Sequence, residues 1–204
     1  ENTPARDIPV PKSYRDALAG PFADYWAAAV LAEIRNLEKY DVWTWQPRSS
    51  MPKGARLIDA TWAWRVKPDN AGLVARFKAR LVARGFRQMK GIGYADSFAP
   101  VVNFTTFRAL MAEAGGQPEW RISCVDIKSA YLCADLQSAV WLKPFAGLTP
   151  PRPGYVLKLS KALYGLACSG RDWNREFHTR LTEIGLVRSK HDTCLYNYHG
   201  AKGE

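Results

Sequence analysis

Long apolar runs, cysteine pairs and histidine clusters are all lacking from this sequence of 204 residues. A membrane-spanning helix needs roughly 18 or more consecutive apolar residues, and no stretch comes near that length. The first residues, ENTPARDIPVPKSYRD, show no apolar segment behind a basic start. We therefore expect no signal peptide, no membrane partner and an intracellular location, cytoplasmic or nuclear.

The scarcity of cysteine and histidine also excludes most metal and disulfide frameworks. The four cysteines contain no CxxC pair, and the three histidines complete no ligand set around the one zinc-like half-motif, HDTC at 191–194. The motifs GxSxG and HExxH and the P-loop are absent. Cys168 and His178 fit one amphipathic helix better than a nucleophile and its base. We expect free thiols and none of the common hydrolase chemistries.

Acidic residues are scarce where basic residues are concentrated. The net charge of +10 comes from 29 Lys and Arg against 19 Asp and Glu. Residues 53–90 hold ten cations and two acids, Asp59 and Asp69, so this segment alone carries +8. Clustered like charges destabilise a fold unless a partner neutralises them, which favours nucleic acid or phosphate as a partner. A solvated basic face is the alternative.

Two alternating segments around this charge predict a β-hairpin. Residues 57–67 alternate so that Ala60, Trp62, Trp64 and Val66 share one face, PDNAG supplies a turn, and residues 73–82 alternate again. The core face of the second strand would carry Leu73, Ala75, Phe77, Ala79 and Leu81. The opposite face of the hairpin would collect five cations: Arg65, Lys67, Arg76, Lys78 and Arg80. Such a face is suited to binding phosphates.

The remaining patterns predict an α+β fold. We expect a helix from about Ser13 to Tyr40 that is interrupted at Pro21, and two short strands, VWLKP and YVLKL. A helix over residues 105–114 would turn Phe107, Leu110 and Met111 inward. The stretch WRISCVD would form a strand ending in Asp126, KSAYLCADL would be helical, and a last helix would span residues 170–184.

Four sequence blocks resemble one protein family. FKARLVARGFRQMKGIGYADSFAPVVNFTTFR is similar to the fingers signature of copia-type (pseudoviral) LTR-retrotransposon reverse transcriptases. DIKSAYL resembles their first catalytic block, LSKALYGLACSGRDW resembles their LYGLxQAPRxW block, and WAAAVLAEIRNLEKYDVW is similar to their N-terminal helix. The blocks stand in the family's order from about Tyr14 to Tyr196.

The resemblance implies a domain organisation. Residues 1–12 would be an extended arm, and residues 13–204 a reverse transcriptase domain with fingers and a partial palm, built as an antiparallel sheet with packed helices. The family's paired acids, YVDD, follow the position of Leu195 and Tyr196, so the expected domain is truncated before the YVDD hairpin. We expect a palm without these strands to expose a sheet edge and to self-associate.

The resemblance also implies a reaction and its metal. The family is an RNA-directed DNA polymerase, a nucleotidyltransferase in which a primer 3′-hydroxyl attacks the α-phosphate of a deoxynucleoside triphosphate. Asp126 would be the catalytic acid and would bind Mg²⁺ or Mn²⁺ together with the backbone carbonyl of Ile127. Without the resemblance, a helix cap would be the simpler role for Asp126. Because the second and third acids are missing, we expect this fragment to be inactive.

Further site residues follow from the matched blocks. Tyr131 would lie under the incoming sugar, and Arg65, Lys67, Lys78 and Arg80 would neutralise the triphosphate, with their individual roles left open. Gly165 and Cys168 would line the nucleotide side, although Cys168 stands where the family has Gln and lacks its amide. Template and primer would contact Arg76, Arg84, Arg87 and Arg171.

Two other interpretations remain open at this stage. The chain could be a noncatalytic nucleic-acid-binding remnant or domesticated fragment, or a structural fragment without activity. In the polymerase interpretation its partners are an RNA template, a DNA primer, deoxynucleoside triphosphates and the rest of a Gag-Pol-like polyprotein.

Overall fold

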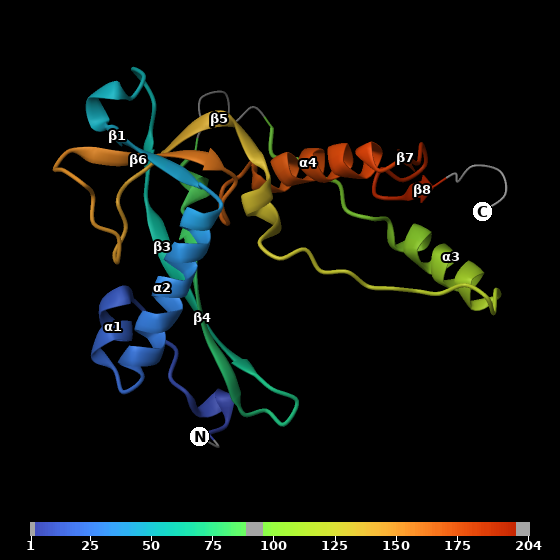
Figure 1. Cartoon of the computed structure of the whole chain (residues 1–204), viewed down its shortest axis with the longest axis horizontal. Coiled ribbons are helices and arrows are strands. Elements are labelled where there is room, and N and C mark those ends of the chain that lie inside the picture. Colours follow the sequence, from blue (N-terminus) through green and yellow to red (C-terminus); the bar gives the residue numbers. More distant parts are fainter. Residues whose placement is uncertain (1–2, 89–95, 199–204) are drawn as a thin grey trace.

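The computed structural model describes residues 3–88 and 96–198. Its helices are α1 (Tyr14–Ala19), α2 (Ala23–Lys39), α3 (Phe104–Gly115) and α4 (Ser169–Glu183), with short 3-10 turns η1 (Ala5–Asp7), η2 (Arg48–Ser50), η3 (Gly85–Arg87) and η4 (Ala130–Cys133). Its strands are β1 (Trp43–Pro47), β2 (Leu57–Ile58), β3 (Ala60–Pro68), β4 (Val74–Ala83), β5 (Asp135–Leu142), β6 (Tyr155–Lys161), β7 (Leu186–Arg188) and β8 (Tyr196–Tyr198). Helices and sheets confirm the α+β class (Figure 1).

The N-terminal helices form where the spacing predicts them. Ser13 caps α1 by accepting a hydrogen bond from Asp16 N at 3.1 Å. Pro21 lies in the short break between α1 and α2. Along α2 the buried residues recur every three or four positions, which places one apolar stripe against the core: Trp26, Val30, Ile34 and Leu37.

The long β3–β4 hairpin confirms the predicted division of its faces (Figure 1). Trp64 pairs with Ala79 and Val66 with Phe77 on the core face, whereas Arg65 lies opposite Lys78 on the other face. Trp26 of α2 packs edge-on against Trp64 and Phe77, with ring centroids 5.4 and 4.7 Å apart. The aromatic side of the hairpin is therefore covered by α2, and its cations remain on the other side.

The central sheet differs from the antiparallel arrangement that we expected. Its order is β1-β6-β5-β2. Strands β1, β6 and β5 are antiparallel neighbours, but β2 pairs with β5 in parallel, so the sheet is mixed. Parallel pairing is possible because a long crossover, including the β3–β4 hairpin, separates β2 from β5 in the chain.

Two glycine-containing segments cross at the base of the hairpin. Gly85 N donates to Gly165 O at 3.1 Å, and Ala83 N donates to Tyr164 O at 2.8 Å. A Cβ atom on either glycine would overlap the backbone of the other segment, and Gly165 has a φ of +88°. The glycines of the GF and LYG motifs are therefore needed for this close approach.

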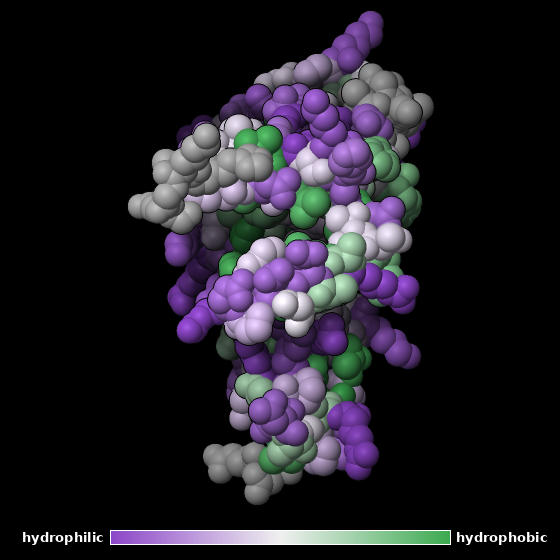
Figure 2. Space-filling model, turned by 90° about the vertical axis from the view of Figure 1, so that its right-hand side faces the viewer, coloured by the Kyte–Doolittle hydropathy of each residue, from purple (hydrophilic) through white to green (hydrophobic). Residues whose placement is uncertain are grey.

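The α3 helix has the predicted position but not the predicted burial. It contains no buried residue, and Phe107 and Leu110 are 45% and 43% exposed. Figure 1 shows α3 and the extended chain after it lying apart from the central sheet and the β3–β4 hairpin. In the view of Figure 2, which faces this side, apolar green atoms lie among purple polar ones. The apolar stripe lacks a partner element among the described residues, which is why the expected inward face is exposed.

Two local expectations around Asp126 are wrong. Residues 120–126 form no strand, because their backbone makes no ladder hydrogen bonds with another described segment. The stretch 128–136 is not a regular helix: it contains only η4 and then enters β5. Ser129, with a φ of +56°, interrupts the helical pattern directly before η4.

The two ends of the described chain are attached to the rest of the molecule. The N-terminal arm is not free, because Val74 N donates to Thr3 O, and Ala5 N donates to Gly72 O. At the other end, Asp192 accepts hydrogen bonds from the backbone of Asn103 and Cys194, both shorter than 3 Å. None of the helices in the described part of the chain has the length and apolar character to cross a membrane.

Candidate nucleotide site

A cavity of about 900 Å³ lies between α2, β4 and the segment that carries Asp126. Its lining comes from four parts of the chain that are distant in sequence: residues of α2 between Tyr25 and Lys39, residues 74–80 of β4, residues 126–129, and Tyr164. The tertiary structure thus brings three of the predicted cations, Arg76, Lys78 and Arg80, into the same cavity as Asp126.

The cations of β4 give the cavity a positive wall. Partial burial lowers the pKa of Lys78, and the neighbouring Arg80 and Arg76 lower it further. Arg65 and Lys67 lie opposite Lys78 and Arg76 on β3 and do not line the cavity. A bound anion would relieve the repulsion among these like charges, so the arrangement favours binding of a polyanion such as a triphosphate.

Glu33 of α2 is a second acid in the cavity, in addition to Asp126. Its Oε1 atom accepts a hydrogen bond from Leu81 N at 3.3 Å, and so caps the outer edge of β4. Burial raises the pKa of Glu33, while the hydrogen bond from Leu81 and the charges of Arg80, Lys78 and Arg76 act in the opposite direction. Sequence reasoning missed this residue, because nothing in the helical pattern distinguishes it from a solvent-exposed glutamate.

Asp126 lies on an exposed, extended segment at the cavity wall. Its carboxylate has no hydrogen bond or ion pair with another described residue, so it is available to a ligand. Ile127 follows it in the same wall. Their oxygens have the hard character that Mg²⁺ prefers.

The described residues do not by themselves complete a metal site. No group of three His, Cys, Asp or Glu side chains that could hold a metal ion occurs in residues 3–88 and 96–198. The Asp126 carboxylate and the Ile127 carbonyl are too few for the pair of ions that a two-metal polymerase site uses. The described donor set therefore does not fit that pair of ions.

An aromatic pair connects Tyr131 to the cavity. The rings of Tyr131 and Tyr164 have centroids 4.9 Å apart, and the guanidinium carbon of Arg80 lies 4.1 Å from the Tyr164 centroid. Tyr164 lines the cavity, whereas Tyr131 does not line it and contacts the cavity only through the Tyr164 ring. Tyr164 comes from the recognised LYGL block, so its sequence position offered a signal that the prediction did not use.

Like Arg65, Lys67 and Tyr131, the predicted nucleotide residues Gly165 and Cys168 lie outside the cavity lining. Gly165 packs against Ala83 and Gly85 at the chain crossing, and Cys168 is fully buried at the start of α4. Burial raises the pKa of the Cys168 thiol, and the neighbouring Asp172 raises it further. In this structure both residues support the fold around the cavity, and their contact with a nucleotide stays a prediction.

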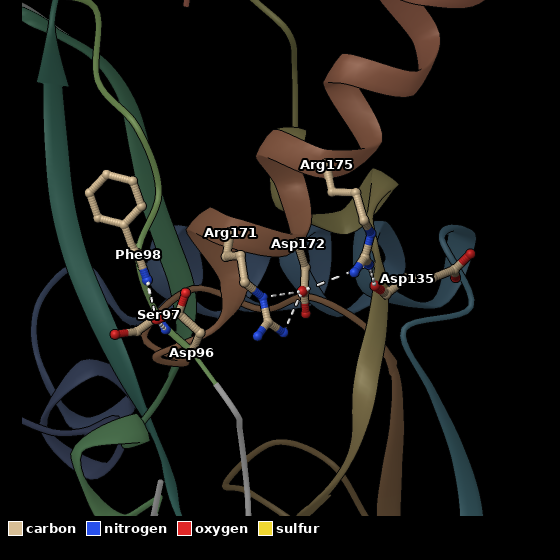
Figure 3. A network of polar contacts seen from close by, with 7 residues as sticks. All are labelled: Asp96, Ser97, Phe98, Asp135, Arg171, Asp172 and Arg175. Atoms are coloured by element: carbon tan, nitrogen blue, oxygen red, sulfur yellow. Dashed lines mark hydrogen bonds and ion pairs between the residues drawn. The ribbon is translucent and has the colours of Figure 1, made fainter. Parts of the chain in front are cut away.

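Arg171 takes part in an ionic cluster at the start of α4 (Figure 3). Its Nε and Nη2 atoms donate to Oδ1 of the fully buried Asp172 at 3.0 and 2.7 Å. Arg175 lies 3.8 Å from the same oxygen and donates to Asp135 O. Because Asp172 holds the guanidinium of Arg171, this cation is positioned by the fold and is not a freely moving surface charge.

The other two predicted nucleic-acid contacts, Arg84 and Arg87, follow the end of β4. Arg84 N donates to Asp59 O, and the Arg87 guanidinium forms an ion pair with the Asp59 carboxylate. Lys143 Nζ lies 2.8 Å from the same carboxylate. Hydrogen bonding from Lys143 is the main cause of a lowered pKa of Asp59.

A basic hairpin and a cavity with a cationic wall lie beside Asp126, an arrangement that favours a polyanionic ligand. Residues 40–203 match the family described as reverse transcriptase (RNA-dependent DNA polymerase). The chain belongs to this family, and the match confirms the resemblance that the motifs indicated.

The relatives identify the kind of protein in which this domain occurs. The chain is 33% identical over 183 residues to the retrovirus-related Pol polyprotein from transposon RE2 of Arabidopsis thaliana, and 36% identical over 154 residues to that from transposon RE1. It is 29% identical over 187 residues to the Pol polyprotein from transposon TNT 1-94 of Nicotiana tabacum. These are copia-type Pol polyproteins.

The aligned residues make up 89%, 75% and 91% of this chain but only 12%, 10% and 14% of the RE2, RE1 and TNT 1-94 polyproteins. The chain thus spans a small part of the length of its relatives. No solved structure matches it significantly.

Proposed function

We propose that this domain serves in RNA-directed DNA synthesis and that its cavity receives the triphosphate of a deoxynucleotide. One observation carries the proposal: Lys78 and Arg80 of β4 line the same cavity as Asp126. In this proposal the β3–β4 hairpin belongs to the fingers of the polymerase, and the Asp126 segment to the beginning of its palm.

The residues of the chain have distinct tasks in this proposal. Lys78 and Arg80 bind and orient the triphosphate by charge-assisted hydrogen bonds, and Tyr131 supports the sugar side through its contact with Tyr164. Asp126 faces the reacting end of the triphosphate. The family implies dependence on a divalent metal, and Asp126 with the Ile127 carbonyl would contribute oxygen ligands to it.

Direct binding of a deoxynucleoside triphosphate tests the proposal. Calorimetry with the wild-type chain should give saturable binding that weakens about ten-fold for Lys78→Ala or Arg80→Ala, in keeping with hydrogen bonds to charged groups. Lys158→Ala is the matched control, because Lys158 is an exposed lysine on another strand, β6. Equal losses in the Lys78 and Lys158 variants would place triphosphate binding elsewhere.

A noncatalytic nucleic-acid-binding role is the second candidate. The incomplete ligand set of the cavity favours it, because the described residues, Glu33 and Asp126 included, complete no metal site. Primer extension on an RNA template with Mg²⁺ or Mn²⁺ distinguishes the two roles. Extension that Asp126→Asn abolishes supports the polymerase role, whereas salt-sensitive binding without extension supports the noncatalytic role.

We further propose that the chain functions within a Pol polyprotein and that the isolated domain self-associates. The exposed apolar residues around α3 support association, since large exposed apolar patches mark interaction surfaces: Phe104, Phe107, Trp120, Ile122 and Val125. Sedimentation should show concentration-dependent association. A monomer at all concentrations would contradict it.

A further inference from the structure

A groove of about 540 Å³ lies beside the end of β4, apart from the nucleotide cavity. Its lining residues are Arg56, Leu57, Phe86, Arg87 and Gln88. It shares no lining residue with the larger cavity. We propose that this groove binds an unpaired base of single-stranded nucleic acid, with Phe86 as the stacking surface; the proposal rests on the proposed function of the domain.

Phe86 presents its ring to solvent from a rigid base. It is 80% exposed, although Gly85 directly before it and Gln88 two residues after it are buried. Gly85 is held by the close crossing with Gly165, and Gln88 Oε1 accepts a hydrogen bond from Ala167 N at 2.9 Å. The backbone is thus fixed while the ring stays uncovered, which reduces the entropy lost when a flat ligand stacks on it.

The charges around the ring favour nucleic acid over a protein or lipid partner. The Arg87 guanidinium carbon lies 5.9 Å from the Phe86 ring centroid, and the exposed Arg56 lines the same groove. Asp59 offsets only part of this charge, because it pairs with both Arg87 and Lys143. A flat apolar surface with cations at its rim matches the base and the flanking phosphates of a single strand.

The groove provides a different kind of contact from the hairpin face. The five cations of β3 and β4 can bind any phosphate backbone, paired or unpaired. Stacking on Phe86 requires a base whose face is uncovered. The structure therefore assigns to Phe86 a role in binding single-stranded nucleic acid in preference to fully paired nucleic acid.

Equilibrium binding to short probes tests this assignment. Fluorescence anisotropy is measured over a range of salt concentrations with single-stranded RNA and DNA of about ten nucleotides, within known site sizes. Phe86→Ala should weaken binding to both probes about five- to ten-fold at each salt concentration without changing the salt slope, because stacking releases no counterions. Phe86→Trp should retain the wild-type affinity.

A matched control and two further probes separate stacking from other effects. Phe98→Ala removes a comparable ring, since Phe98 is 71% exposed and does not line the groove. This variant should bind the single strands as the wild type does. For an abasic strand and for a fully paired duplex, Phe86→Ala should have no effect, because neither offers an uncovered base to the ring.

Several results would overturn the assignment. These are an unchanged affinity of Phe86→Ala, an equal loss for Phe98→Ala, a loss that persists on the abasic strand, or no single-strand binding by the wild type. Triphosphate binding in the cavity is measured separately. If triphosphate binding is found but Phe86→Ala leaves single-strand binding unchanged, only the stacking site is overturned. If Phe86→Ala weakens single-strand binding but no triphosphate binds, only the nucleotide cavity is overturned.

Discussion

The region from α2 to β4 and the region around α3 contain similar apolar patterns but pack in different ways. Residues 23–83 bury Trp26, Trp62 and Leu81, whereas no residue between 96 and 129 is buried. In the first region a helix and a hairpin supply matching apolar faces. In the second, α3 and the extended segment after it have no such partner. An apolar stripe therefore determines a helix, but its burial depends on a second surface.

Tryptophan substitutions in the two regions should give the largest difference in the free energy of unfolding. Trp26 is 2% exposed and Trp120 is 50% exposed. Trp26→Ala should lower the free energy of unfolding by about 3–5 kcal/mol, because it leaves a cavity between α2 and the hairpin. Trp120→Ala should change it by about 0.5 kcal/mol or less. Denaturant unfolding measures both, and equal effects would break the comparison.

Alanine at the chain crossing should have the next largest effect. Gly165→Ala combines a positive φ with overlap against Ala83, and should cost about 3 kcal/mol of unfolding free energy. Gly154 has a similar φ of +81° but open space around it. Gly154→Ala should therefore cost only about 1 kcal/mol. If thermal unfolding gives the same loss of unfolding free energy for Gly165→Ala and Gly154→Ala, the close approach of the two chain segments is not the reason that position 165 requires glycine.

Removal of the Glu33 charge, inside the packed region, should have a smaller effect, and this effect is on triphosphate affinity. Glu33→Gln keeps an oxygen that can accept the hydrogen bond from Leu81 N but removes a negative charge from the cavity. We expect triphosphate affinity to rise about two- to five-fold, as for a partly exposed charge interaction. The gain should shrink at high salt. A weaker affinity would mean that the charge of Glu33 positions the β4 cations.

The smallest effect on global stability should come from Asp192, which holds the start of the α3 region by accepting a hydrogen bond from Asn103 N. Hydrogen bonds from Cys194 N and Asn103 N lower its pKa. A lowered folded pKa means that this stabilisation is complete above the unfolded carboxyl pKa of about 3.9 and is lost as the pH falls through the folded value.

Hydrogen exchange at Asn103 and Cys194 measures this local loss. Protection should fall on acidification in the wild type, and Asp192→Asn should show low protection that no longer depends on this titration. Asp16→Asn, at an exposed position in α1, is the control. Unchanged protection at low pH would mean that other contacts attach this segment.

Local patterns predicted much of the fold. The break at Pro21, the two faces of the hairpin, strand β6, the end of strand β5 and the extent of α3 and α4 all agree with the sequence, because each depends on periodicity or on a single backbone-restricting residue. The parallel pairing of β2 with β5 and the absence of a strand at residues 120–126 were not predictable in this way. Both depend on which segments become neighbours.

The same division applies to the candidate site. The sequence by itself determined the family, the concentration of cations on one hairpin face and the candidacy of Asp126, since motifs and alternation are local properties. Only the tertiary structure decided that Arg76, Lys78 and Arg80, but not Arg65 or Lys67, line a cavity with Asp126, and that Glu33 and Tyr164 join them. A cavity wall is formed by elements distant in the chain, and their mutual placement results from packing of the whole domain.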